Sequence, residues 1–139
     1  MMRNALVSGD AAARPRVLVV DDDAMMCEAV DQVLRDMCEV ITTTRPQDVP
    51  KLLADGLEVD LLVLDVQMPV MTGMELHRVL VATAPELASH TIFITGGLAI
   101  PDIAAFFDSV SNRCVDKPFT EEQLLDAVCA ELEACGWTT

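Results

Sequence analysis

Carboxylates stand directly after two short apolar runs of the chain, where they could bind a divalent cation. The run over residues 17–20 is followed by Asp21, Asp22 and Asp23, and a second run ends in Asp65. Clustered carboxylates repel one another, and a hard cation with oxygen ligands removes that repulsion. An aspartate before a helix also acts as an N-cap, which is the simpler interpretation for Asp23 alone.

A hydroxyl and an ammonium group follow two further apolar segments. Thr95 ends the run over residues 91–95, and Lys117, one of two lysines, follows a weaker strand signal near residues 113–116. Ligands of an open parallel sheet bind outside the carboxyl ends of its strands. We therefore expect these groups to meet the aspartates at one edge, where the ammonium could neutralise a phosphoryl oxygen.

The segments between the apolar runs have the periodicity of helices. Met26, Val30 and Val33 form an apolar stripe, while Thr72 and Thr120 each begin a capping box. The expected strands are 17–20, 40–43, 60–65, 91–95 and 113–116, each followed by a helix. This alternation predicts an α/β fold, a doubly wound five-stranded parallel sheet with helices on both faces.

Length and charge limit the classes of function. The 139 residues suggest one domain, and the net charge of −14 argues against direct binding of nucleic acid or of an anionic membrane surface. No apolar run approaches the roughly 20 residues of a membrane span, and the first 14 residues lack the apolar region of a signal peptide. A cytoplasmic location is expected.

The boundaries expected are a flexible N-terminal tail over residues 1–15, one domain over 16–135 and a C-terminal tail over 136–139. The five cysteines show no metal-type spacing and are expected to be small hydrophobic residues. His77 and His90 are expected on the surface.

Taken in order along the chain, these motifs resemble the receiver domain of two-component response regulators, the CheY-like family. The residues that carry the resemblance are Val19-Val20-Asp21-Asp22, Leu64-Asp65-Val66-Gln67-Met68-Pro69, Gly73, Ile94-Thr95-Gly96 and Lys117-Pro118-Phe119. The resemblance covers roughly residues 16–135 and implies the flavodoxin-like strand order 2-1-3-4-5.

The resemblance also implies a role for each site residue. Asp65 matches the phosphoacceptor, and Thr95 and Lys117 match the groups that contact the phosphoryl oxygens. The implied cofactor is Mg²⁺ or Mn²⁺. Its implied ligands are Asp21, Asp22, Asp65 and the backbone carbonyl of Gln67. The Lys117–Pro118 peptide bond is expected to be cis.

The implied function is a phosphoacceptor in signalling rather than a dedicated enzyme, with self-catalysed transfer and later autodephosphorylation. The implied partners are a sensor histidine kinase or a histidine phosphotransfer protein, with a downstream protein on the face of the family's helix 4, strand 5 and helix 5. The sequence leaves open whether the chain forms a homodimer. It also leaves open whether the chain is a stand-alone regulator or a piece of a hybrid kinase.

One position departs from the family pattern. Cys114 stands three residues before Lys117, where receivers usually have tyrosine or phenylalanine, so we expect weaker output coupling through this strand. Two alternatives remain: a haloacid-dehalogenase-like phosphatase, which would need an acid at Gln67, and a pseudo-receiver that never takes phosphate.

Overall fold

A parallel five-stranded sheet forms the centre of the computed structural model, which describes residues 14–137. The strand order is β2-β1-β3-β4-β5, as the resemblance predicts. All neighbouring strands are parallel. The strands are β1 Arg16–Val20, β2 Glu39–Thr43, β3 Leu61–Asp65, β4 Thr91–Thr95 and β5 Cys114–Asp116.

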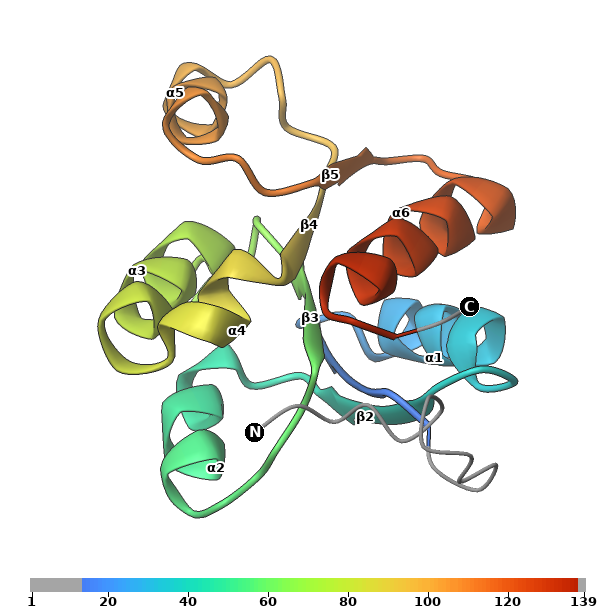
Figure 1. Ribbon diagram of the computed structural model, residues 1–139. Helices are drawn as coiled ribbons and strands as arrows, with labels where there is room; N and C mark the ends of the chain where they lie inside the picture. Colours follow the sequence, from blue (N-terminus) through green and yellow to red (C-terminus); the bar gives the residue numbers. More distant parts are fainter. Residues whose placement is uncertain (1–13, 138–139) are drawn as a thin grey trace.

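Helices cover both faces of the sheet, which explains why β3 and β4 are apolar along nearly their whole length. Every residue of these two strands is buried. The helices are α1 Ala24–Leu34, the short 3₁₀ turn Pro46–Asp48, α2 Val49–Ala54, α3 Gly73–Thr83, α4 Pro85–Ser89, α5 Pro101–Ser109 and α6 Glu121–Ala134. Figure 1 shows α1 and α6 on one face, with α2, α3 and α4 on the other.

The two faces of the sheet carry separate apolar clusters, because successive strand residues point to opposite sides. Val17, Val19 and Val63 pack with α1 and α6. Leu18 and Leu64 pack with the helices on the opposite face. This division fixes the alternation of side chains and therefore sets which residues reach each end of the strands.

Local capping signals place the beginnings of three helices. The side chains of Thr72 and Thr120 accept hydrogen bonds from backbone N–H groups in the capping boxes of α3 and α6. Asp23 caps α1 by accepting from the Met25 N–H at 2.9 Å. Gly136 follows α6 with φ +97°, the left-handed conformation that commonly ends a helix.

Several expectations are corrected. Trp137, placed in the C-terminal tail, is 4% exposed and packs in the core, because the chain turns back at Gly136. Pro15, placed in the N-terminal tail, is buried and its carbonyl accepts from the Glu39 N–H at 2.9 Å. The rest of that expected tail, up to residue 13, lies outside the described residues.

Two further expectations are corrected inside the domain. His77 is buried rather than on the surface, and the short helix α4 was not expected.

Within residues 14–137, no helix combines the length and apolar character needed to cross a membrane.

Candidate functional site

The aspartates predicted to act together lie at one edge of the sheet, beyond the carboxyl ends of adjacent strands. Asp21 follows β1 and Asp65 ends β3, and each is 3% exposed, whereas Asp22 is exposed. The strands bring them together because Val20 of β1 is the register partner of Leu64 in β3. One carboxylate oxygen from each of the three aspartates lies within 4.8 Å of the other two.

Lys117 supplies the positive charge of this site. Its Nζ lies 3.1 Å from Asp65 Oδ1 and 3.9 Å from Asp21 Oδ2. The Lys117 backbone N–H donates to the Thr95 carbonyl at 2.8 Å, which fixes the residue beside the end of β4. The Lys117–Pro118 bond is cis, as the resemblance implies.

Burial and mutual repulsion make the carboxylates reluctant to be charged. Burial raises the pKa of Asp21 to about 6, and the negative charges of Asp65 and Asp22 add to that rise. Burial also raises the pKa of Asp65, with Asp22 adding to it and the Lys117 ammonium opposing it. One ammonium group therefore does not fully compensate the three carboxylates, and the site favours an additional cation.

The donor set fits a hard divalent ion such as Mg²⁺, because carboxylate oxygens are the ligands that such ions prefer. Oxygens of Asp21, Asp22 and Asp65 converge from two strand ends without a sulfur or nitrogen donor among them. The pKa of Asp21 is raised first by burial and further by the charges of Asp65 and Asp22, and a bound cation would oppose this rise by favouring the charged carboxylate.

Thr95 and Gln67 flank the aspartates. Thr95 is fully buried at the end of β4, one residue beyond Ile94, which is the register partner of Asp65. Its Oγ1 accepts from the Gly97 N–H at 2.9 Å. Gln67 is exposed, and its Oε1 is 3.0 Å from where a Cβ on Gly97 would stand. A small residue at 97 thus lets the Gln67 side chain lie over the loop after β4.

Gly73 shows a requirement for glycine that its place in the sequence motif alone does not explain. A Cβ at Gly73 would collide with the carbonyl oxygen of Asp65. The Gly73 N–H also donates to the Val66 carbonyl at 2.9 Å, so the start of α3 lies directly against the end of β3. This close approach positions the loop that contains Gln67.

Two residues that the sequence singles out, Asp23 and Cys114, lie outside the site and have other structural roles. Asp23, the third of the consecutive aspartates, serves as the helix cap, in agreement with its simpler interpretation. Cys114, at the position where receivers usually have an aromatic residue, pairs in register with Phe93 and packs half-buried against the cluster on the α3 and α5 side. The expectation of weaker output coupling stays a prediction.

Comparisons with known proteins agree with this geometry. The family model described as "Response regulator receiver domain" matches residues 17–129. The chain is 32% identical over 123 residues to the probable transcriptional regulatory protein TcrX of Mycobacterium tuberculosis, covering 88% of this chain and 52% of that protein. The chain thus spans about half the length of the curated relatives it matches.

Solved structures show the same fold. The BeF3-activated receiver domain of DrrB, a Thermotoga maritima protein, superposes with a TM-score of 0.74 and 30% identity, covering 87% of this chain and 99% of that one. The chemotaxis protein CheY4 of Vibrio cholerae gives a TM-score of 0.72 and 26% identity, covering 85% and 98%. With the family match over most of the chain, these likenesses place it: the protein belongs to the response regulator receiver domains.

Proposed function

We propose that the domain accepts a phosphoryl group on Asp65 from the phosphohistidine of a partner protein, with Mg²⁺ or Mn²⁺ as cofactor. The observation that carries the proposal is the contact of the Lys117 ammonium with Asp65, beside two further carboxylates at the same edge. A nucleophilic oxygen, a cation and a set of hard donors are the groups that phosphoryl transfer requires.

The metal would be held by Asp21, Asp22 and Asp65, with the backbone carbonyl of Gln67 as a further ligand. Once bound, the ion supplies positive charge to the equatorial oxygens of the transferring group. Lys117 adds its charge on the side of Asp65 Oδ1, to which it already donates at 3.1 Å. Thr95 offers a hydroxyl at the end of the neighbouring strand, and its O–H can donate to a phosphoryl oxygen while Oγ1 accepts from the Gly97 N–H.

In the proposed step, a carboxylate oxygen of Asp65 forms a bond to phosphorus while the phosphorus–nitrogen bond of the phosphohistidine breaks. The electron pair of that bond remains on the imidazole of the partner, and Asp65 becomes an acyl phosphate. Water later attacks the phosphorus and restores the carboxylate with release of inorganic phosphate. Asp65 is 3% exposed, which limits the access of water, and the bond from Lys117 Nζ to Oδ1 orients its carboxylate.

The proposed partners follow from the family. A sensor histidine kinase or a histidine phosphotransfer protein donates the phosphoryl group. The face of α5, β5 and α6 transmits the result to a downstream protein or to a second copy of the chain. This face corresponds to the family's helix 4, strand 5 and helix 5, because α4 shifts the numbering here.

Incubation with acetyl phosphate tests the proposal. We expect the wild-type chain to gain one phosphoryl group in the presence of Mg²⁺, and much less after chelation, as measured by intact-protein mass spectrometry. Asp65→Asn should lose the labelling. Asp108→Asn, which changes an exposed aspartate on α5, should keep it. Equal labelling of Asp65→Asn and the wild type would contradict the assignment.

The same samples separate the alternatives. A phosphatase of the haloacid-dehalogenase type would hydrolyse p-nitrophenyl phosphate with repeated turnover, whereas we expect none because position 67 has an amide in place of an acid. A pseudo-receiver would take no label under any condition.

A further inference from the structure

A second group of metal-binding side chains lies at the opposite edge of the sheet, where the strands begin. His90 directly precedes β4, Glu131 lies in the last turn of α6, and Cys135 follows that helix. One donor atom from each of these residues lies within 4.8 Å of the other two. They include a nitrogen, an oxygen and a sulfur donor, unlike the all-oxygen set around Asp65.

The central carboxylate of this group is already oriented. The Glu131 side chain is 9% exposed, and its Oε2 lies 2.8 Å from His90 Nδ1. Arg113 Nε donates to the other oxygen, Oε1, at 3.1 Å. A carboxylate with one oxygen fixed by an arginine and the other facing an imidazole has the outer support that is usual for metal ligands.

The ion pairs of Glu131 with His90 and Arg113 do not involve the third member of the group, the thiol of Cys135. Cys135 Sγ lies 3.6 Å from the carbonyl oxygen of Asp60, to which it donates a hydrogen bond. Burial raises the pKa of this thiol to about 12, with the negative charges of Glu131, Asp60 and Glu86 adding to the rise. The surroundings therefore disfavour a bare thiolate and would favour one that is neutralised by a cation.

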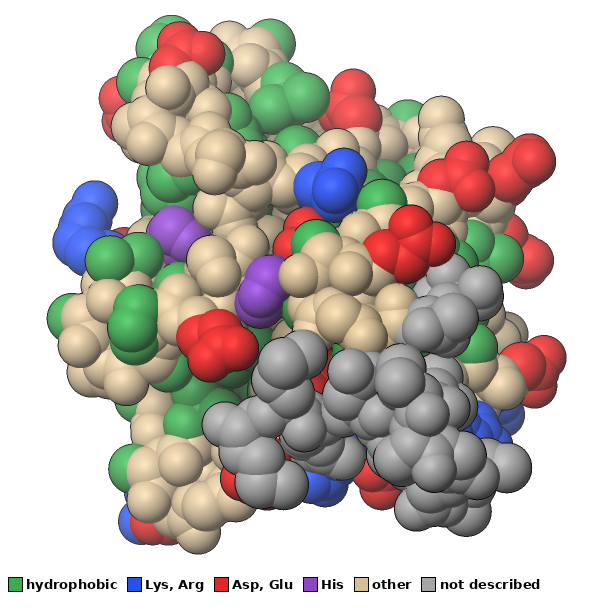
Figure 2. All heavy atoms as spheres, in the orientation of Figure 1, with side chains coloured by type: hydrophobic (Ala, Val, Ile, Leu, Met, Phe, Trp, Pro, Cys, Tyr) green, Lys and Arg blue, Asp and Glu red, His purple; other side chains and the backbone are tan. Residues whose placement is uncertain are grey.

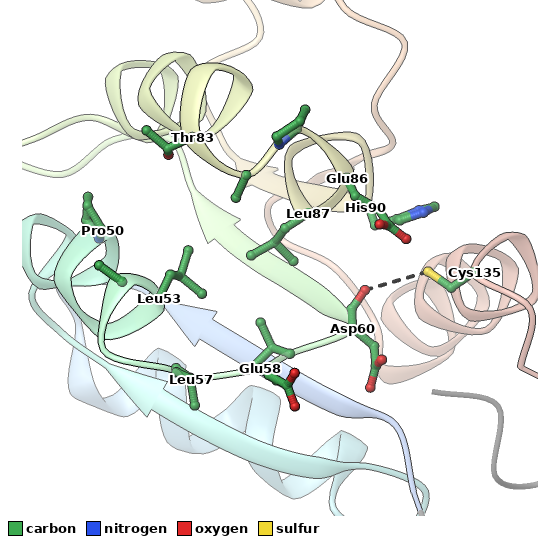
Figure 3. A pocket seen from close by; sticks show the side chains of 14 residues that line it. Pro50, Leu53, Leu57, Glu58, Asp60, Thr83, Glu86, Leu87, His90 and Cys135 are labelled. Atoms are coloured by element: carbon green, nitrogen blue, oxygen red, sulfur yellow. Dashed lines mark hydrogen bonds between the residues drawn. The ribbon is translucent and has the colours of Figure 1, made fainter. Parts of the chain in front are cut away.

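Two of the three residues line a groove, and Glu131 lies buried behind them. The groove has a volume of about 860 Å³ and is lined by residues of α2, α4 and the loop before β3, together with His90 and Cys135. Figure 3 shows Glu86, His90 and Cys135 beside this groove, with the dashed line marking the bond from Cys135 to Asp60. A hydrated ion could reach His90 and Cys135 through this groove and contact Glu131 behind them. Acidic side chains are spread over this side of the molecule in Figure 2 and would attract it.

We propose that His90, Glu131 and Cys135 form a binding site for a borderline transition-metal ion, with Zn²⁺ as the best fit. Thiolate, imidazole and carboxylate together are ligands of zinc, whereas Mg²⁺ and Ca²⁺ prefer oxygen alone. Binding uses His90 Nδ1, one Glu131 oxygen and the Cys135 sulfur. The proton now shared between Nδ1 and Glu131 is replaced by the metal, so the neutral imidazole carries its proton on Nε2, and the thiol proton passes to solvent. A water molecule or the exposed Glu86 carboxylate supplies the fourth donor.

The ion would join the start of β4 to the end of α6. These segments are 41 residues apart in the sequence and are connected by the contact of His90 with Glu131. Because α6 belongs to the face through which we expect signalling output, occupancy of this site would stiffen one side of that face. The proposal does not depend on phosphorylation of Asp65, since the two sites use different edges and different donor types.

Cobalt and zinc titrations of the whole metal-free chain, in excess Mg²⁺ to fill the oxygen site, test the proposal. We expect one equivalent of Co²⁺ to produce the near-ultraviolet band of thiolate-to-cobalt charge transfer, and Zn²⁺ to abolish it. Cys135→Ser should remove the band. Cys129→Ser, a matched change of another half-buried cysteine on α6, should leave it intact.

His90→Gln gives a second, independent variant. It should weaken Zn²⁺ binding by at least about tenfold in calorimetry. Loss of a residue that only hydrogen-bonds to a metal ligand already lowers metal affinity by about that factor, and loss of the ligand itself should lower it at least as much. Zn²⁺ should also raise the melting temperature of the wild type and of Cys129→Ser, but much less that of His90→Gln and Cys135→Ser. A wild type without the thiolate band, or unchanged Zn²⁺ affinity in both ligand variants, would overturn the site. Acetyl phosphate labelling of the same variants reports separately on Asp65.

Discussion

At the scale of single residues, the functional edge combines groups that are individually unfavourable. Asp21 and Asp65 are almost fully buried carboxylates, and Lys117 is the cation that contacts both of them. A buried charge costs free energy unless it is paired, so this arrangement is maintained by neighbouring structure rather than by its own stability. The glycine that brings the start of α3 against β3 is part of that support.

Replacement of Gly73 by alanine should be destabilising. The new Cβ would collide with the Asp65 carbonyl oxygen, which is backbone and cannot move aside without shifting β3. We expect Gly73→Ala to lower the free energy of unfolding in urea by about 1–3 kcal/mol, the usual cost of overpacking.

Gly96→Ala provides the matched control, because the nearest atom to its added Cβ would be Lys117 Cβ at 3.5 Å, an ordinary contact. Its free energy of unfolding should change by less than about 0.5 kcal/mol. Equal losses in the two variants would mean that the close approach at Gly73 is not the cause.

Site residues could be predicted from the sequence because each is next to a strand end, and parallel strands align their ends. The placement of Asp21, Asp22, Asp65, Thr95 and Lys117 at one edge follows from that rule alone.

The burial of His77 is a matter of helix spacing rather than of strand ends. His77 follows Leu76 and stands three residues before Leu80, so it lies on the buried face of α3, a signal that the surface expectation overlooked. The aromatic residues that enclose its ring come from other elements and could not be named from that spacing.

At the scale of elements, short-range signals predicted the ends of helices better than their number. The capping boxes at Thr72 and Thr120 and the stop at Gly136 involve residues close in sequence, and all three are present in the structure. The five-residue helix α4 was missed because it is shorter than two turns and has no periodicity to detect. Likewise, β5 has only three residues, which explains its weak signal.

The group of His90, Glu131 and Cys135 could not be predicted from short-range signals. Glu131 lies on α6 and Cys135 follows that helix four residues later, but His90 reaches them only through the folded sheet. No spacing rule for metal ligands would connect residues separated in this manner.

His77 joins α3 to β4, α4 and α5, and it should make stability depend on pH. Its ring packs edge-on against Phe93 and Phe106, and Nε2 lies 3.2 Å from the Ala88 carbonyl oxygen. Burial lowers the pKa of His77 below the ordinary 6.5. Below pH 6.5 the unfolded chain therefore binds the proton more readily than the folded one, so stability should fall as the pH falls.

His77→Phe should remove this part of the acid sensitivity. Between pH 7.5 and 5.5 its free energy of unfolding should fall less steeply than that of the wild type, by up to about 1.4 kcal/mol per pH unit, the limit for one proton. The Ala88 carbonyl would keep its bond from Asn112 Nδ2 at 2.9 Å. Identical pH slopes from urea unfolding would show that the His77 ring does not titrate differently in the two states.

At the scale of the whole molecule, charge is the dominant feature. The net charge of −14 is spread over a chain of 139 residues, and like charges oppose the compact state. TcrX is described as a probable transcriptional regulatory protein, and the chain matches about half of the length of TcrX. The expectation that this chain does not contact nucleic acid directly therefore stays a prediction.

Screening of these charges should stabilise the fold. We expect an increase from 20 mM to about 500 mM NaCl to raise the free energy of unfolding by about 1 kcal/mol, or roughly 4 °C in melting temperature by circular dichroism. Choline chloride at the same ionic strength should raise the free energy of unfolding by nearly the same amount, because it screens charges equally. Its large cation cannot occupy the aspartate site. A benefit from NaCl alone would assign the effect to ion binding instead of screening.

The burial of Trp137 has a practical consequence. The chain contains one tryptophan and no tyrosine, so its fluorescence above the phenylalanine range comes from a single indole. That indole is 4% exposed and packs with the residues of α1, α6 and the sheet. Its emission should shift to longer wavelength when the C-terminal segment leaves the core, which gives an unlabelled optical reporter of detachment at the edge farthest from Asp65.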